Sequence, residues 1–189
     1  NNKNMATKYE EQLRSIFNNV NEWLKYAEAK NFGLLTLIVA IAFGFTQINF
    51  SKESELKTVG CYIFLPIAFF SFFSSLLSLF AILSKFEKGY LVKSLIDKLS
   101  NLIDEEKSFE NIHYFGYLRT LDEANFETKF LTKINSTDIF TQYEKELTKQ
   151  ILYNSRITWL KYQLFKIGAF IFLFALILSI IALPILQFF

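Results

Sequence analysis

The fold of this chain is decided by residues 167–189, which read IGAFIFLFALILSIIALPILQFF and contain no charged side chain. Two earlier stretches are also uncharged, 31–51 with 21 residues and 58–84 with 27 residues. At about 1.5 Å rise per residue, each stretch is long enough to cross a hydrocarbon core of about 30 Å as a helix. All 20 Lys and Arg and all 18 Asp and Glu lie outside these stretches. The sequence therefore predicts an all-α membrane protein with three transmembrane helices and excludes a soluble single domain.

The rest of the composition narrows the class of protein. A single cysteine, Cys61, cannot form an intrachain disulfide, and a single histidine, His113, cannot complete a Cys/His zinc site. The formal charge of +2 is too small to indicate a protein that coats nucleic acid, and the low counts of 6 Gly and 2 Pro favour long helices. We expect no metal, no resident cofactor and no direct contact with nucleic acid.

The distribution of basic residues predicts how the chain lies in the membrane. The link 52–57 is six residues long, so the first two spans form a hairpin and 85–166 lies on the same side as 1–30. Lys52 and Lys57 are the basic residues of the link. Ten basic residues lie near the span ends on the other side: Lys25, Lys30, Lys85, Lys88, Lys93, Lys98, Lys149, Arg156, Lys161 and Lys166. Because basic residues favour the cytoplasmic side, we expect a multi-pass protein of the bacterial inner membrane with 1–30 and 85–166 in the cytoplasm and 52–57 outside.

Helical periodicity predicts that the cytoplasmic part extends the membrane helices. Thr7 and Glu10 have the spacing of a capping box, so 1–30 is predicted to be a helix that runs into the first span. Its apolar residues recur at three and four positions: Leu13, Ile16, Phe17, Val20, Trp23, Leu24 and Ala27. The second span is predicted to continue to about Glu106. Because the first apolar stretch follows about thirty mostly polar residues, we expect no signal peptide.

Two further helices are predicted from cap signals. Thr120 and Glu123 form a second capping box for a short helix that ends near Lys133. Residues 138–166 are predicted to form the last helix, which runs into the third span. Three cap-type residues precede it: Asn135, Ser136 and Thr137. Between the second span and the short helix, residues 109–118 are rich in aromatic side chains and are predicted to form a strand or an ordered loop.

A stripe of small polar residues follows the second span. Ser71, Ser75 and Ser78 fall at positions i, i+4 and i+7. Small residues at this spacing let helix backbones approach and let hydroxyl groups bond across the interface. The stripe either closes the three-helix bundle of one chain or faces another subunit and lines a pore in a homo-oligomer. No charged residue lies within a span, which argues against a proton-relay transporter.

Two helix faces near the membrane have the chemistry of a binding site. The first helix carries four residues at helical spacing: Asn19, Trp23, Tyr26 and Lys30. The last helix carries a similar set: Arg156, Trp159 and Gln163, with Lys161 and Tyr162 nearby. Aromatic rings stack on bases and basic groups pair with phosphates, so two such faces could hold a nucleotide. The alternative is the belt of aromatic and basic residues that is usual at membrane interfaces.

The sequence gives little sign of catalysis. His113 has no Ser or Cys nucleophile with a motif around it, and no glycine-rich loop is present to bind a phosphate chain. We therefore expect no catalytic residues and interpret the chain as a binding protein rather than an enzyme.

Three blocks of sequence resemble a known family. Residues 20–31, VNEWLKYAEAKN, lead straight into a span and resemble the N-terminal signature of the Pycsar transmembrane effector family. The block 114–116 (YFG) and the late block 155–157 (SRI) with Lys161 and Tyr162 agree with that family in order and position. The resemblance covers nearly the whole chain.

The resemblance implies an antiphage effector that a cyclic pyrimidine mononucleotide, cCMP or cUMP, activates. Binding of this second messenger to the cytoplasmic part of the chain, with its sensing region 85–166, would lead to disruption of the inner membrane and abortive infection. The matched blocks and the helix faces together suggest the ligand residues. One or two of Arg156, Lys30 and Lys161 would pair with the phosphodiester, and Trp23, Tyr114 or Phe115 would stack on the base.

The sequence leaves two alternatives open. A related membrane effector could recognise a cyclic oligonucleotide, which would require a larger and more basic pocket. A passive membrane scaffold could instead use its cytoplasmic helices to bind a partner protein. Membrane lipids and further copies of the chain are expected partners in the leading interpretation.

Overall fold

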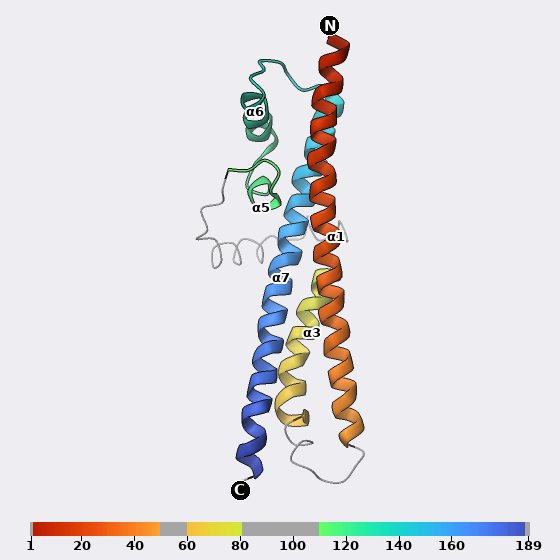
Figure 1. Ribbon diagram of the computed structural model, residues 1–189, viewed down its shortest axis with the longest axis vertical. Coiled ribbons are helices and arrows are strands. Elements are labelled where there is room, and N and C mark those ends of the chain that lie inside the picture. Colours follow the sequence, from red (N-terminus) through yellow and green to blue (C-terminus); the bar gives the residue numbers. More distant parts are fainter. Residues whose placement is uncertain (1, 50–59, 81–109, 188–189) are drawn as a thin grey trace. The chain divides into compact units, whose positions relative to one another are not determined.

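The computed structural model describes residues 2–49, 60–80 and 110–187 of the chain (Figure 1). In those ranges every regular element is helical. The elements are α1 (Asn2–Asn49), the π-helical turn η1 (Gly60–Phe64), α3 (Leu65–Phe80), α5 (Phe115–Leu118), α6 (Glu123–Lys133) and α7 (Gln142–Gln187). The prediction of an all-α protein is confirmed for these residues. The strand or loop predicted for 109–118 is wrong at 115–118, which form α5.

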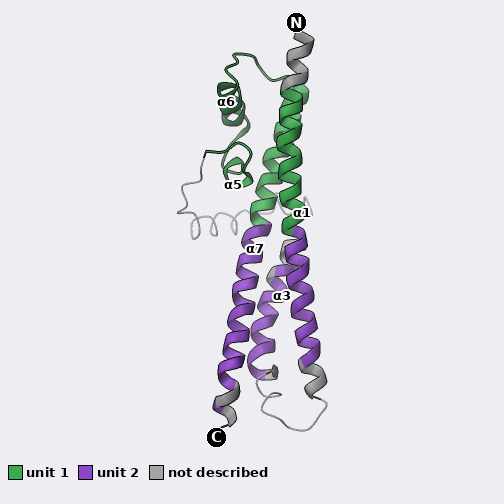
Figure 2. Ribbon diagram, viewed as in Figure 1, with its two compact units in different colours: residues 1–27, 84–160 green, residues 28–83, 161–189 purple. Residues whose placement is uncertain are grey.

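The chain divides into two compact units (Figure 2). Unit 1 comprises residues 1–27 and 84–160, and unit 2 comprises residues 28–83 and 161–189. The helices α1 and α7 each contribute residues to both units.

Unit 1 is built on two parallel helical segments, with α5 and α6 covering them. Arg14 of α1 contacts Tyr143 of α7, and Asn21 contacts Asn154, so residue numbers rise in the same direction along both helices. Of the apolar face predicted for 1–30, Leu13, Ile16, Val20 and Ala27 are buried, whereas Phe17 and Leu24 are partly buried and Trp23 is 38% exposed. The core comprises Leu13, Ile16, Val20, Ile112, Tyr117, Leu118, Leu121, Phe126, Phe130, Phe140, Leu147, Ile151 and Leu152. The ring centroids of two of its members, Phe130 and Phe140, lie 5.4 Å apart.

The caps of two helices differ from the sequence prediction. Because α1 already begins at Asn2, Thr7 lies inside the helix and not at its N-cap. The N-cap of α6 is Asp122, whose side chain accepts a hydrogen bond from the Asn125 amide at 2.7 Å. Thr120 instead donates its hydroxyl to the carbonyl of Tyr117 in the turn that follows α5. The predicted Thr120 cap is therefore wrong, because Thr120 belongs to the turn after α5 and Asp122 takes the N-cap position of α6.

Asn135 ends α6 and does not open the last helix. It adopts a left-handed conformation with φ of 51°, which Asn tolerates better than most residues. The amide of Ser136 donates to the carbonyl of Leu131, and that of Asn135 donates to Thr132, the bond pattern of a Schellman motif. The last helix begins at Gln142, four residues after the predicted start.

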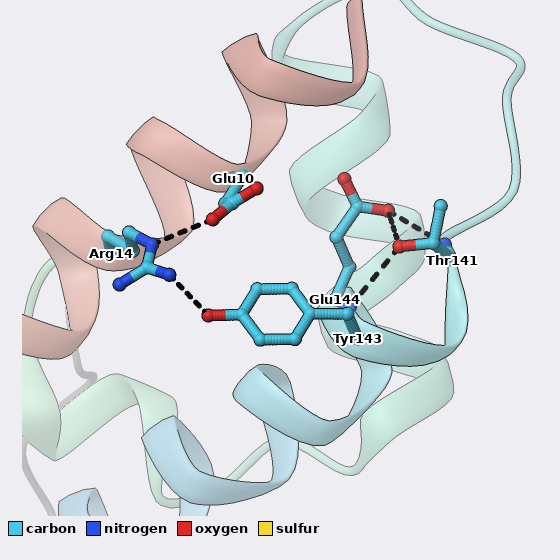
Figure 3. Close-up of polar contacts among 5 residues, drawn as sticks. All are labelled: Glu10, Arg14, Thr141, Tyr143 and Glu144. Carbon is cyan, nitrogen blue, oxygen red and sulfur yellow. Dashed lines mark hydrogen bonds and ion pairs between the residues drawn. The ribbon is translucent and has the colours of Figure 1, made fainter. Parts of the chain in front are cut away.

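The N-terminus of α7 is closed by a capping box that the sequence prediction missed (Figure 3). The Glu144 carboxylate accepts from the backbone amide and the hydroxyl of Thr141 at 2.7 and 2.8 Å, and the Glu144 amide donates back to the Thr141 hydroxyl at 3.3 Å. Beside it, Arg14 donates to Glu10 and to the Tyr143 hydroxyl, and these bonds, the one to Glu10 first, raise the pKa of Arg14 above its ordinary value.

Unit 2 packs segments of α1, α3 and α7 around a small apolar core. Its buried members are Leu34, Ile38, Phe64, Ala68, Phe172 and Ala175. Phe64 meets Phe172 and Ser71 meets Gly168, so α3 runs antiparallel to α7. This is the direction that the predicted hairpin requires of the second span.

The outward surface of unit 2 is apolar. Its exposed large side chains include Phe32, Leu37, Val39, Phe43, Tyr62, Phe69, Phe70, Phe73, Phe170, Leu173, Phe174, Ile177, Ile180, Ile181 and Ile185. Within α1 and α7, the stretches Tyr9–Gly44 and Gln142–Ala182 are long and apolar enough to cross a membrane. Only 22% of the most apolar part of each is buried inside the chain, whereas the core helix of a soluble protein is mostly buried. The outward apolar surface is what a lipid environment favours.

The second predicted span is covered only in part. Its described portion contains a shorter apolar helix, Tyr62–Phe73. The structure therefore supports two membrane-spanning helices, and the third span stays a prediction. The link 52–57 and the predicted continuation of the second span to Glu106 lie outside the described residues.

Candidate functional site

Three of the predicted ligand residues come together on unit 1. The ring of Phe115 in α5 lies 5.7 Å from Trp23 of α1 and 4.8 Å from Tyr114, measured between ring centroids. Trp23 is 38% exposed and Tyr114 is 41% exposed, whereas Phe115 is buried beneath them. Tyr26 extends the group at 6.3 Å from Trp23. We call these four residues the aromatic surface.

Local contacts hold the aromatic surface in place. Asn19 donates its side-chain amide to the carbonyl of His113 at 2.7 Å, which fixes the turn before α5 against α1. The backbone amide of His113 donates to the Asn111 side chain at 2.9 Å. A Cβ at Gly116 would overlap the ring of Tyr114, so glycine is needed for this ring position. The exposed His113 contributes backbone groups to these contacts, and among the described residues no cluster of His, Cys, Asp or Glu could hold a metal.

Arg156 lies at a different feature of unit 1, a pocket beside α6 and α7. The pocket has a volume of about 350 Å³ and is lined by Glu123, Lys149, Gln150, Leu152, Tyr153 and Arg156. We call it the α6–α7 pocket. Arg156 is exposed and donates one guanidinium N–H to the carbonyl of Leu121 at 3.2 Å. Of the pocket residues, the sequence prediction had named only Arg156 as a ligand contact. The seven-residue spacing of Lys149 and Arg156 on one helix was the available signal.

The predicted binding face of the last helix is not one exposed surface. Trp159 is buried in unit 1, where the Arg119 guanidinium lies 4.0 Å from the centroid of its ring. Gln163 is buried in unit 2. Trp159 and Gln163 therefore do not extend the exposed surface on which Arg156 lies.

Lys161 and Lys30 belong to unit 2 and have partners there. Lys161 is completely buried, and its ammonium lies 2.7 Å from a carboxylate oxygen of Glu28. The ammonium of Lys30 lies 5.3 Å from the ring centroid of Tyr162 and 5.5 Å from that of Phe165. A buried cation already paired with a carboxylate is poorly placed to receive a phosphate. The ligand role of the two lysines stays a prediction.

The serine stripe lies partly inside unit 2. Ser71 and Ser75 are completely buried, and the Ser71 hydroxyl donates to the carbonyl of Gly168 in α7 at 2.6 Å. A Cβ at Gly168 would lie 3.4 Å from the Ser75 hydroxyl. This geometry agrees with the interpretation that the stripe closes the helix bundle of one chain. The side chain of Ser78 lies outside the described part of the structure, and a role of the stripe in a homo-oligomer stays a prediction.

A chain whose described elements are all helical, with two apolar helices of membrane-spanning length, belongs to the class of helical membrane-associated proteins. The comparison with known families is more specific. The sequence profile of the Pycsar effector protein domain matches residues 12–186, which is nearly the entire chain. The chain therefore belongs to the Pycsar effector family and is an antiphage defence effector. No curated protein and no solved structure matches it.

Proposed function

We propose that this effector binds a cyclic pyrimidine mononucleotide, cCMP or cUMP, through unit 1 and then disrupts the bacterial inner membrane through unit 2, so that an infected cell dies before phage is released. The observation that carries the proposal is the family match over residues 12–186. In this proposal unit 1 lies in the cytoplasm and the apolar helices of unit 2 lie in lipid. Several copies assemble when the membrane is breached.

The chemistry of unit 1 supports a mononucleotide as the ligand. Unit 1 offers aromatic rings on which a base can stack in two places, Trp23 and Tyr114 at the aromatic surface and Tyr153 in the α6–α7 pocket. Its α6–α7 pocket presents Arg156, which can pair with a phosphate. A volume of about 350 Å³ lies near the lower end of the range for small-molecule sites, about 300–1,000 Å³, and favours a mononucleotide over a cyclic oligonucleotide.

The connection between the units supports a ligand-driven response. Both α1 and α7 contribute residues to unit 1 and to unit 2 without interruption of the helix. A ligand shifts an equilibrium between resting and active states only if it binds one of them more tightly. Continuous helices give binding in unit 1 a direct mechanical route to the apolar helices.

The proposal is tested with the full chain in liposomes that contain a self-quenched dye. We expect cCMP or cUMP to release the dye, and cAMP and cGMP to release none at the same concentration. Titration calorimetry of the detergent-solubilised chain measures binding separately from membrane action. The proposal would be contradicted if neither cCMP nor cUMP bound to the chain and neither released the dye. Nucleotide binding without dye release would support the proposed nucleotide binding and contradict the proposed disruption of the membrane.

A further inference from the structure

The α6–α7 pocket has a mixed lining whose charged members come from two helices. Glu123 lies in the first turn of α6, and the other lining residues lie on α7. Lys149, Tyr153 and Arg156 are spaced at i, i+4 and i+7, which places them on one face of that helix. Leu152 belongs to the core of unit 1, so the floor of the pocket is apolar and anchored. An apolar base with a few charged and polar side chains around it is typical of small-molecule sites.

The polar groups of the pocket match a planar ligand with one negative charge. Two cations and one carboxylate line it, which leaves one net positive charge. The Arg156 guanidinium is positioned by one bond to a backbone carbonyl, and a guanidinium has five N–H donors in all. Gln150 offers an amide that can bond to the edge of a base, and Tyr153 offers an aromatic ring. A nucleoside cyclic phosphate has one charge, one base edge and one planar ring face.

Glu123 and Lys149 form a weak pair that a ligand can replace. Their charged atoms are 3.7 Å apart, and their side chains are 56% and 57% exposed. Exposed pairs of this kind contribute little to stability, so Lys149 can exchange the carboxylate for a phosphate at small cost. The carboxylate of Glu123 then remains close to the bound phosphate. A linear nucleoside monophosphate carries close to two negative charges at neutral pH, and its second charge would be repelled there.

We propose that the α6–α7 pocket is the cyclic-nucleotide site of unit 1, in which Lys149 and Arg156 bind the phosphodiester and Glu123 discriminates against linear monophosphates. This inference rests on the proposed function. It assigns ligand contacts to Lys149, Gln150 and Tyr153, and it gives Glu123 a role in specificity. The aromatic surface is then not required for nucleotide affinity.

The test uses the full chain in detergent, with cCMP, cUMP, CMP and UMP as probes in titration calorimetry. Lys149→Met and Arg156→Met should each lower the affinity for the cyclic nucleotide that binds the wild type by about 10- to 100-fold, the factor expected for a lost charge-assisted hydrogen bond. Lys145→Met, at an exposed position one turn earlier on α7, is the matched control and should stay within about twofold. Glu123→Gln should narrow the preference for cyclic over linear nucleotide by about tenfold. Circular dichroism confirms that each variant is helical.

The outcomes separate the pocket from the general function. If Trp23→Ala abolishes binding while Lys149→Met and Arg156→Met bind as tightly as the wild type, the pocket assignment is overturned and the proposed function survives. If the wild type binds neither cyclic pyrimidine nucleotide, the proposed function and the pocket assignment both fail. If Glu123→Gln leaves the preference for cyclic nucleotides unchanged, the role of Glu123 is wrong.

Discussion

Lys161 and Glu28 form an ion pair in which the ammonium nitrogen lies 2.7 Å from the carboxylate oxygen, and only one partner is sealed from solvent. The Lys161 side chain is 0% exposed, whereas that of Glu28 is 36% exposed. Asn31 adds a bond to the backbone carbonyl of Lys161 at 3.2 Å. A buried ammonium is tolerated because a charge partner is present, so the pair joins α1 to α7 where unit 2 begins.

Removal of the Glu28 charge should therefore lower the free energy of unfolding more than removal of the Lys161 charge. Glu28→Gln leaves a buried cation without its counter-charge. We expect the free energy of unfolding to fall by about 3 kcal/mol, the lower end of the range for breaking a buried ion pair, because Glu28 is partly exposed. Lys161→Met removes the charge and keeps an apolar side chain of similar length, so its cost should stay below about 1 kcal/mol. Unfolding of the detergent-solubilised chain by SDS titration measures both. Equal losses in the two variants would show that the charge is not the important feature.

The close approach of α3 to α7 should make Gly168 intolerant of larger side chains. A Cβ there would meet Leu34 at 3.3 Å and the Ser71 carbonyl at 3.5 Å. Gly168→Val should destabilise unit 2 by about 1–3 kcal/mol through overpacking, which thermal melting in detergent can detect. Gly33→Val is the matched control, because nothing lies within 4 Å of a Cβ at that position. A similar fall in melting temperature for the two variants would contradict the close helix contact.

The capping box of α7 should have a measurable contribution to stability. Thr141→Ala removes the hydroxyl that bonds both the carboxylate and the amide of Glu144, and we expect a loss of about 1 kcal/mol. Thr141→Ser keeps the hydroxyl and should restore most of that loss. Denaturation of the full chain monitored by circular dichroism gives the comparison. The capping role would be refuted by a Ser variant as unstable as the Ala variant.

Lys129 should make stability depend on pH in the alkaline range. Its ammonium donates to the Tyr117 hydroxyl and to Glu110 at 3.1 Å, and these hydrogen bonds, the one to Tyr117 first, raise its pKa above the ordinary value. A pKa that is higher in the folded state gives a contribution that is complete below the unfolded pKa of about 10.4 and is lost as pH rises through the folded value.

This direction of the pH dependence predicts how the wild type and Lys129→Met differ in thermal stability. The melting temperature of the wild type should exceed that of Lys129→Met by a constant amount between pH 6 and about pH 9, and the difference should shrink above about pH 10.4. Lys133→Met, at an exposed position in the last turn of α6, is the control for removal of a helix lysine. A difference between wild type and Lys129→Met that grows with alkaline pH would contradict the assignment.

The site could be predicted only in part from the sequence. The spacing of Trp23 on a helix near a span marked it as a ligand candidate, and it does lie beside Phe115. The same reasoning gave Lys161 and Arg156 equal weight, although one is sealed inside unit 2 and the other lines an open pocket. From the sequence, Lys149 is one of ten basic residues near the span ends, and its spacing alone does not make it a ligand candidate. Helical spacing identifies which residues share a face, but it does not say which neighbour covers that face.

The sequence by itself determined the helical class, the apolar spans of α1 and α7 and the buried face that includes Leu13, Ile16 and Val20. These follow from short-range physics, because a run of uncharged residues and a period of three to four residues act along one helix. The tertiary structure decided which cap-type residues close a helix, as at Asp122 and Thr141, and which cations are buried. Those outcomes depend on contacts between residues far apart in the chain, such as Glu28 with Lys161. Several residues near each helix end can act as a cap, and only the packing of the whole unit decides which of them does so.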